Sequence, residues 1–80
     1  MGRSNEDKAV LQEFGRRVRR ARNRCGWSQI ELAEKAGLNR AYVGGSERGE
    51  RNVGLVNVNR LALALGERFD GLLPYRAGRK

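Results

Sequence analysis

Hydrophobic residues near the start of the chain recur at steps of three and four positions. This stripe consists of Leu11, Phe14, Val18, Ala21 and Cys25. A stripe with that period is the inward face of an amphipathic helix, and a glycine directly after it, here Gly26, is a common helix stop. The pattern predicts a long first helix, with the Cys25 thiol buried or half-buried at its end.

Two shorter helical patterns follow, and Gly37 separates them. Ser28 and Glu31 have the spacing of a capping box, which starts a helix. The inward face of this second helix consists of Ile30, Leu32, Ala33 and Ala36. Gly37 supplies the positive φ that ends a helix at low cost. Asn39 has the side chain to cap a third helix that begins at Arg40.

The third helix, residues 40–48, has Val43 as its inward residue. Its outward residues are Arg40, Ala41, Gly44, Gly45 and Arg48. Residues 28–48 thus form two short helices joined by a tight glycine turn. This arrangement is the helix-turn-helix unit, which can lay its second helix in the major groove of DNA.

The remaining apolar positions close the core. A fourth helix has an inward stripe made of Leu55, Val58, Leu61, Ala62 and Leu65. A short fifth helix over about residues 69–73 places Phe69 and Leu72 inward. Leu73 and Tyr75 then lie outward, where an apolar patch on so small a domain marks a partner surface. The predicted fold is all-α, with five helices in one domain over residues 1–80 and an ordered core over about 6–75.

Composition narrows the possible functions. Eighteen apolar residues in a row, the minimum for a membrane-spanning helix, are absent from the sequence. The net charge is +8 and the pI about 11.1, which suits a polyanion: nucleic acid first, an acidic membrane surface second. With no histidine and one cysteine, a Cys/His zinc site and a Ser-His or Cys-His catalytic pair are excluded within one chain. We therefore expect no metal, no cofactor and no enzymatic activity, and a cytoplasmic location.

The first helix carries a set of arginines with no acidic residue among them. The set consists of Arg16, Arg17, Arg19, Arg20, Arg22 and Arg24. Exposed helix faces usually mix charges to relieve repulsion. An unmixed set indicates that the counter-charge comes from outside the chain, either as DNA phosphate or as an acidic protein partner.

Several stretches together resemble one known family. The pattern SQ-x-ELA-x-x-AGL-x-R-x-Y-V, followed by ERGERN, is similar to the DNA-binding domain of the lambda repressor and Cro family, also called the xenobiotic-response-element family. FGRRVRRAR before the unit, and NRLALALG and FDGLL after it, extend the resemblance over roughly residues 14–73. The resemblance implies a five-helix repressor-type fold, sequence-specific binding to duplex DNA, and transcriptional regulation.

The third helix is the predicted reading element. Its base-reading candidates are Asn39, Arg40, Ala41, Gly44 and Gly45. Arg40 can bond guanine O6 and N7 bidentately, and the Ala41 methyl group suits a thymine methyl. Gly44 and Gly45 depart from the family, which places long polar residues there. Either the backbone approaches DNA closely at these glycines, with shape readout adding specificity, or the helix reads few bases.

Phosphate contacts are expected from residues that flank the reading helix. The candidates are Gln29, Tyr42, Arg51, Asn52 and Arg17. The resemblance implies this role for Gln29, Arg51 and Asn52, and the N-terminus of a helix at Gln29 favours an anion. Tyr42 is equally well read as a packing residue. Arg17 belongs to the arginine set of the first helix.

The resemblance also implies two structural features of the third helix. An acid at the position of Glu47 forms a buried ion pair with an arginine at the position of Arg22. Ser46 stands where the family has a large apolar residue, so its hydroxyl must bond a backbone carbonyl or leave a small gap.

One such domain contacts only half a site on DNA. We therefore expect a homodimer on an inverted repeat, joined through the last helix with Leu73 and Tyr75 near the centre of the interface. No effector-binding segment is evident, so occupancy would follow the protein's own concentration, as in the small phage repressors and restriction-modification controller proteins it is similar to. Two alternatives stay open: an antitoxin-type module that holds a protein partner, and a non-specific protein that coats nucleoid DNA.

Overall fold

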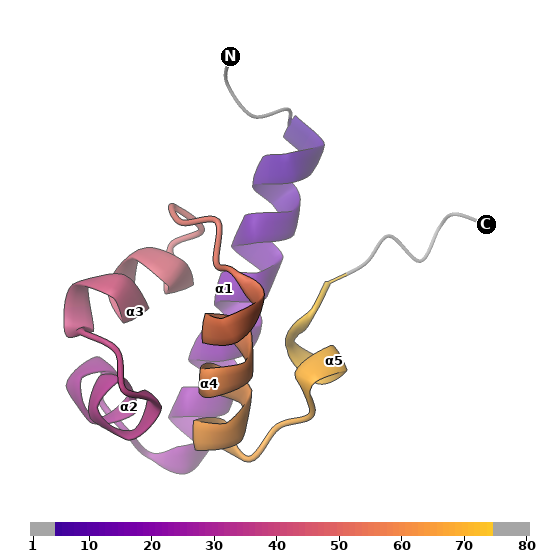
Figure 1. Ribbon diagram of the computed structural model, residues 1–80. Coiled ribbons are helices and arrows are strands. Elements are labelled where there is room, and N and C mark those ends of the chain that lie inside the picture. The colour runs from indigo at the N-terminus through magenta and orange to yellow at the C-terminus, as the bar shows by residue number, and fades with distance from the viewer. Residues whose placement is uncertain (1–4, 75–80) are drawn as a thin grey trace.

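The computed structural model describes residues 5–74 and contains only helices there. The five helices are α1 (Asn5–Cys25), α2 (Gln29–Ala36), α3 (Arg40–Glu47), α4 (Leu55–Leu65) and α5 (Phe69–Leu72). The predicted all-α class with five helices is confirmed. In Figure 1, α4 lies in front of the long α1, with α2 and α3 on one side of this pair and α5 on the other.

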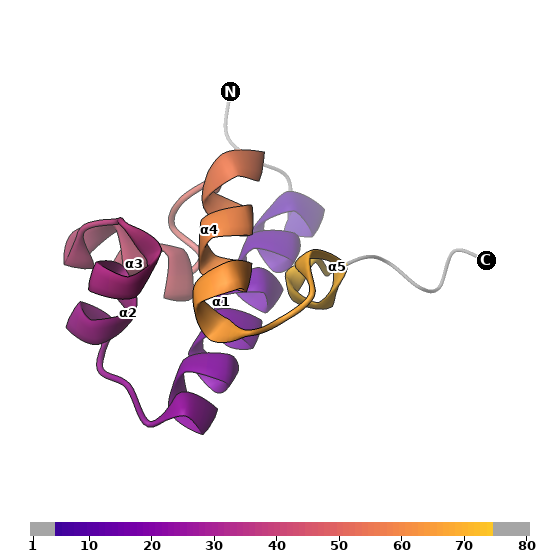
Figure 2. The same ribbon diagram turned by 60° about the horizontal axis from the view of Figure 1, so that its bottom comes forward.

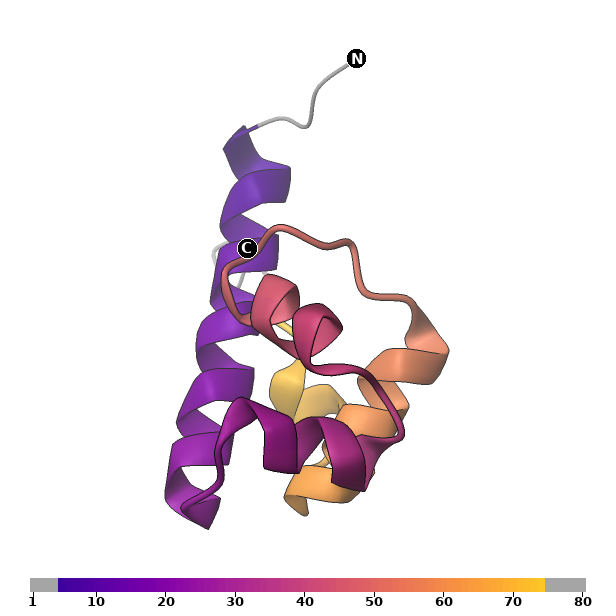
Figure 3. The same cartoon turned by 90° about the vertical axis from the view of Figure 1, so that its left-hand side faces the viewer.

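The boundaries of the helix-turn-helix follow from its capping residues. The Ser28 hydroxyl accepts a hydrogen bond from the Glu31 N–H at 3.1 Å, and the Glu31 carboxylate accepts one from the Ser28 N–H at 2.8 Å. Gly37 ends α2 at φ +72°. Asn39 caps α3 by accepting a bond from the Tyr42 N–H at 2.7 Å. These contacts confirm the predicted capping box, glycine turn and cap. Figure 3 shows α2 from the side and α3 nearly end on above it, joined by that short turn.

The core lies where α1, α2, α3 and α4 meet, and α5 covers it from the other side (Figure 2). Most predicted inward positions supply it. Its buried apolar residues are Phe14, Val18, Ala21, Leu32, Ala33, Ala36, Val43, Val58, Leu61, Ala62, Leu65 and Leu72. The Ser46 hydroxyl, also buried, donates to the Tyr42 carbonyl at 2.8 Å, which confirms that a backbone carbonyl satisfies it.

Three predictions of burial are wrong. Cys25 is exposed, because it stands in the last turn of α1 and its thiol reaches only the Leu65 carbonyl, at 3.9 Å. Ile30 is 51% exposed, since it lies on a different face of α2 from Leu32. Leu55 is 74% exposed, because it is the first residue of α4 and the buried positions of that helix begin at Val58.

Two glycines set how closely α1 packs on α3 and on the loop behind it. A Cβ on Gly15 would collide with the backbone carbonyl of Glu47 and lie 2.6 Å from that of Ser46. A Cβ on Gly49 would lie 2.8 Å from the Gln12 side chain. The backbones of α1 and α3 therefore touch directly at Gly15, a contact that no apolar pattern in the sequence indicates.

Candidate nucleic-acid interface

Arg40 stands at the start of α3 with its side chain exposed to solvent. Within residues 5–74 its guanidinium has no hydrogen bond or ion pair, so all its donors are open to a ligand. Ala41 beside it is also exposed. Asn39 is exposed too, but its side-chain oxygen is engaged in capping the helix. The N-terminal turn of α3 thus presents one free cation and one methyl group.

Gly44 and Gly45 are buried, although both lie on the side of α3 that was predicted to be open. Two arginine side chains from beyond the helix cover them. A Cβ on Gly44 would lie 3.2 Å from Arg48 Nη1, and one on Gly45 would lie 2.9 Å from Arg51 Nε. The prediction that Gly44 and Gly45 face outward is therefore wrong, because arginine side chains occupy the space that glycine leaves; close approach of their backbone to DNA stays a prediction.

Arg51 lies against α3 rather than extending from its loop. Its guanidinium carbon is 4.9 Å from the centre of the Tyr42 ring, a cation–π geometry. Tyr42 is half-buried, and Arg51 itself is exposed. Tyr42 therefore serves as a packing platform for Arg51, while its contact with phosphate stays a prediction.

Glu47 is the buried centre that ties α3 to α1 and α2. Its carboxylate is fully buried and accepts bonds from Arg22 Nε at 2.6 Å and Arg22 Nη2 at 2.9 Å. Gln29 donates to it at 3.1 Å and Arg19 at 3.4 Å. Burial would raise the pKa of Glu47, but the bonds from Arg22 and Gln29 outweigh it and hold that pKa below its ordinary value. Glu47 is therefore a charged, fully paired group that fixes the orientation of the reading helix.

Gln29 divides its hydrogen-bonding groups between the interior and the surface. One amide N–H is used by Glu47, and the side-chain oxygen lies 3.3 Å from where a Gly44 Cβ would stand. The second amide N–H and the backbone N–H groups of Gln29 and Ile30 stay open, whereas the Glu31 N–H is used by Ser28. A phosphate contact at Gln29 would use these groups.

The arginine set of α1 is half neutralised within the chain, so the prediction that its counter-charge comes only from outside is wrong in part. Glu13 pairs with Arg16 and Arg17, and Glu67 pairs with Arg24. Arg19 and Arg22 meet Glu47, as described above. Over residues 5–74, Arg20 alone of the set has no such carboxylate partner. Glu13 is a sequence neighbour, three and four positions before its partners, whereas Glu47 and Glu67 lie far along the chain and only the fold brings them to α1.

Arg17 was a predicted phosphate contact, and the structure places it elsewhere. Its Nη1 donates to the Gly71 carbonyl at 3.2 Å, and its Nε meets Glu13 at 3.0 Å. Arg17 therefore lies on the α5 side of α1, and its two contacts give it a structural role in holding α5.

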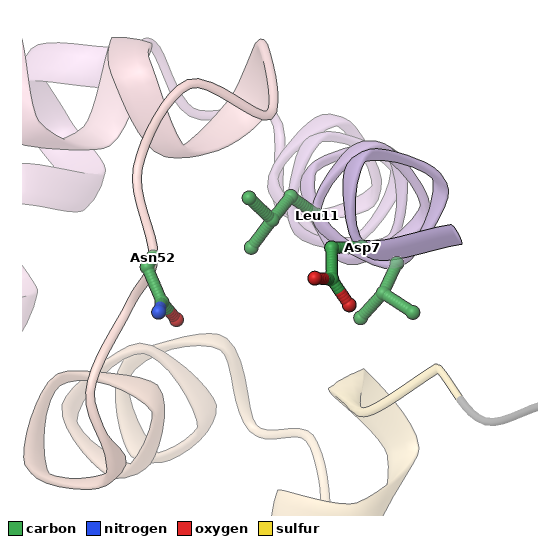
Figure 4. Close-up of a pocket in the computed structure, with 4 residues that line it drawn as sticks. Asp7, Leu11 and Asn52 are labelled. Carbon is green, nitrogen blue, oxygen red and sulfur yellow. The ribbon is translucent and has the colours of Figure 1, made fainter. Parts of the chain in front are cut away.

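Asn52 lies in the α3–α4 loop and is exposed. It faces a hollow of about 260 Å³ that is also lined by Asp7, Val10 and Leu11. Figure 4 shows the Asn52 side chain across this hollow from Asp7 and Leu11 on α1. Asn52 is thus at the edge of the α3 surface, toward the first turns of α1.

The predicted dimer residues lie at the end of the described chain. Leu73 is half-buried and packs against the core, lining a small apolar hollow with Phe14 and Val53. The prediction that Leu73 points fully outward is therefore wrong. Tyr75 lies outside the described residues. Among residues 5–74, no helix has the length and apolar character needed to cross a bilayer, and no cluster of three or more potential metal ligands occurs.

Two short helices, α2 and α3, are joined by a tight glycine turn, with a free arginine at the exposed start of the second, which is the arrangement of a helix-turn-helix DNA-binding domain. A helix-turn-helix family model matches residues 18–72. The chain belongs to this family, of the Cro/C1 type, as the sequence resemblance predicted.

Known proteins agree with this assignment. The chain is 40% identical over 63 residues to the control protein C.BamHI of Bacillus amyloliquefaciens, covering 78% of each chain. It is 48% identical over 50 residues, 61% of its own length, to a hypothetical transcription factor of Neisseria meningitidis, and the match spans 47% of that protein. The crystal structure of the restriction-modification controller protein C.AhdI from Aeromonas hydrophila superposes with a TM-score of 0.79 at 51% identity, covering 81% of this chain and 98% of that one. The domain is that of a sequence-specific DNA-binding transcriptional regulator.

Proposed function

We propose that the protein is a controller-type regulator that binds an inverted repeat as a homodimer and represses or adjusts transcription of its own gene. The relatives that carry the name of control or controller protein support this role. The observation that carries it is the free Arg40 guanidinium at the start of a reading helix whose orientation Glu47 fixes. The protein would act on chromosomal DNA in the cytoplasm, without a cofactor or small-molecule effector.

The proposed readout divides the contacts by chemistry. Arg40 bonds a guanine in the major groove and Ala41 meets a thymine methyl, while the Asn39 amide N–H groups, which capping does not use, contact the same step. Around them, Gln29, Tyr42, Arg51 and Asn52 hold the phosphate backbone. Because phosphate contacts fix position and base contacts give specificity, the two sets have separable effects.

The experiment is selection of bound duplexes from a random DNA pool at near-physiological salt. We expect an inverted repeat with half-site centres about 10 base pairs, or roughly 34–36 Å, apart. Arg40→Ala should relax one defined position in each half-site. Binding that falls with salt but enriches no motif would instead indicate a non-specific coating protein.

An acidic protein partner has less support than the sequence suggested. The unmixed arginine set was the feature that favoured an antitoxin-type module. Glu13, Glu47 and Glu67 balance half of the charge of those six arginines. The open cation at Arg40 lies on the reading helix, where DNA is the fitting ligand.

A further inference from the structure

The outward face of α3 is occupied by side chains that belong to its end and to the following loop. Gly44 and Gly45 each lie three or four residues from both Ala41 and Arg48, so the four residues share that face. Gly44 contributes no side chain there. In its place lie the Arg48 guanidinium, with Nη1 at 3.2 Å from the position of a Gly44 Cβ, and beside it the Gln29 side-chain oxygen at 3.3 Å.

The path of Arg48 follows from helix geometry. Side chains on a helix lean toward its N-terminus, so Arg48 lies back over the preceding turn. A residue with a long side chain at Gly44 would occupy the same space. Glycine at this position therefore gives Arg48 access to the middle of the reading face.

Glu50 fixes one side of the Arg48 guanidinium. Its carboxylate oxygen lies 3.0 Å from Arg48 Nε. Both side chains are more than half exposed, at 54% and 61%, so the pair lies at the surface, where a ligand can reach it. Because a guanidinium carries five N–H donors, pairing at Nε leaves the two terminal nitrogens able to bond a guanine edge bidentately.

We propose that Arg48 reads a guanine in each half-site, in place of the side chain that Gly44 lacks, with Glu50 as its positioning residue. This inference rests on the proposed function, since it assigns a second specificity-determining arginine to the same reading helix. Arg40 reads from the first turn of α3 and Arg48 from its end, so the two contacts fall on different base pairs.

The test compares the motifs that variants select from a random duplex pool, with Arg68→Ala as the matched control. Arg68 is 84% exposed and pairs with Asp70, so its loss removes one arginine at a site away from α3. Arg48→Ala should lose preference at one base pair per half-site, different from the one that Arg40→Ala relaxes. Its affinity for the wild-type motif should fall about 10- to 100-fold, the effect of losing one bidentate arginine–guanine contact.

Two further variants test the geometry without removing Arg48. Gly44→Ala places a methyl group against Nη1, favours the helix, and should weaken preference at the same base pair. Glu50→Gln should do so as well, by a smaller factor, because the arginine loses its fixed side. A structural role for either residue would not produce a change confined to that base pair.

The outcomes separate this inference from the function on which it rests. If the wild-type protein selects a motif and Arg48→Ala selects the same motif with uniformly weaker, less salt-dependent binding, then Arg48 contacts phosphate and the inference is wrong. If the wild-type protein selects no motif, the proposed readout fails together with it.

Discussion

At the scale of single residues, the most consequential group is the buried carboxylate of Glu47. It joins three helices through Arg22, Gln29 and Arg19. A fully buried charge is tolerated only when its partners compensate for lost hydration. This requirement makes the pair with Arg22 a condition for the geometry of the reading helix.

Glu47→Ala should lower the free energy of unfolding by about 3–5 kcal/mol, because it leaves Arg22, only 13% exposed, without its partner. Urea denaturation measures this. Glu50→Ala is the matched control, since the Arg48–Glu50 pair is exposed and such pairs contribute about 0–1 kcal/mol. Equal losses in the two variants would show that Glu47 is no more than a surface charge.

The same carboxylate gives stability a defined dependence on pH. The folded-state pKa of Glu47 lies below its ordinary value of 4.5, so the unfolded chain binds its proton first as pH falls. The stabilisation from Glu47 is thus complete above that ordinary value and is lost as pH falls through the folded-state pKa. The stability gap between wild type and Glu47→Gln should be largest near pH 7 and should shrink below about pH 4.5. A gap that stays constant down to pH 2 would contradict this account.

Gly15 matters because it has no side chain, which allows α1 to pack directly against the backbone of α3. Gly15→Ala would improve helix propensity, yet its methyl group collides with the Glu47 carbonyl. We expect a net loss of roughly 1–3 kcal/mol in thermal or urea unfolding, the usual cost of overpacking. Gly71→Ala is the control, because its nearest neighbour would be 3.7 Å away. A stabilised Gly15→Ala variant would mean that α1 and α3 can separate without cost.

At the scale of elements, the helix-turn-helix depends on a few local contacts. The Ser28–Glu31 capping box starts α2 and orients its first turn toward any bound phosphate. Ser28→Ala should cost about 1 kcal/mol in stability, and Ser28→Asp should recover most of it, because an aspartate can accept the same N–H bond. Denaturation curves of the two variants measure the difference. Equal losses would show that the cap contributes little.

Helix boundaries were predictable because their causes are local. Ser28, Gly37 and Asn39 act within a few residues of themselves, and so do the apolar stripes. Burial at helix ends was less predictable, as Cys25 and Leu55 show, because it depends on where neighbouring helices stop.

The candidate site was predictable only in part, for the same reason. Arg40 is exposed at the start of α3 as expected, because a cap and a helix period suffice to place it. The path of Arg48 over Gly44 depends on the side chain turning back along the helix and on Glu50 beyond it. The role of Arg17 depends on α5 lying beside α1, far away in sequence. Neither the spacing of apolar residues nor the resemblance to the repressor family indicates the path of a side chain or a contact between distant helices.

At the scale of the whole molecule, the net charge of +8 is unevenly neutralised. Glu13, Glu47 and Glu67 engage arginines of α1. Arg40 and Arg51, on and against α3, have no carboxylate partner among residues 5–74. Part of the unpaired positive charge therefore lies on and against α3, where it attracts the DNA backbone.

A single reading helix covers too little DNA for high specificity, so we expect two chains to associate. We expect a sedimentation mass twice the 9.0 kDa of one chain. Tyr75→Ala should shift it toward the monomer and make DNA binding weaker and more dependent on protein concentration. Leu73→Asp should do the same, but Leu73 also packs on the core, so thermal unfolding must first show that this variant folds. If both folded variants remain dimeric, two chains join through another surface. The exposed apolar residues of α4, Leu55, Val56 and Leu63, are then the next to change.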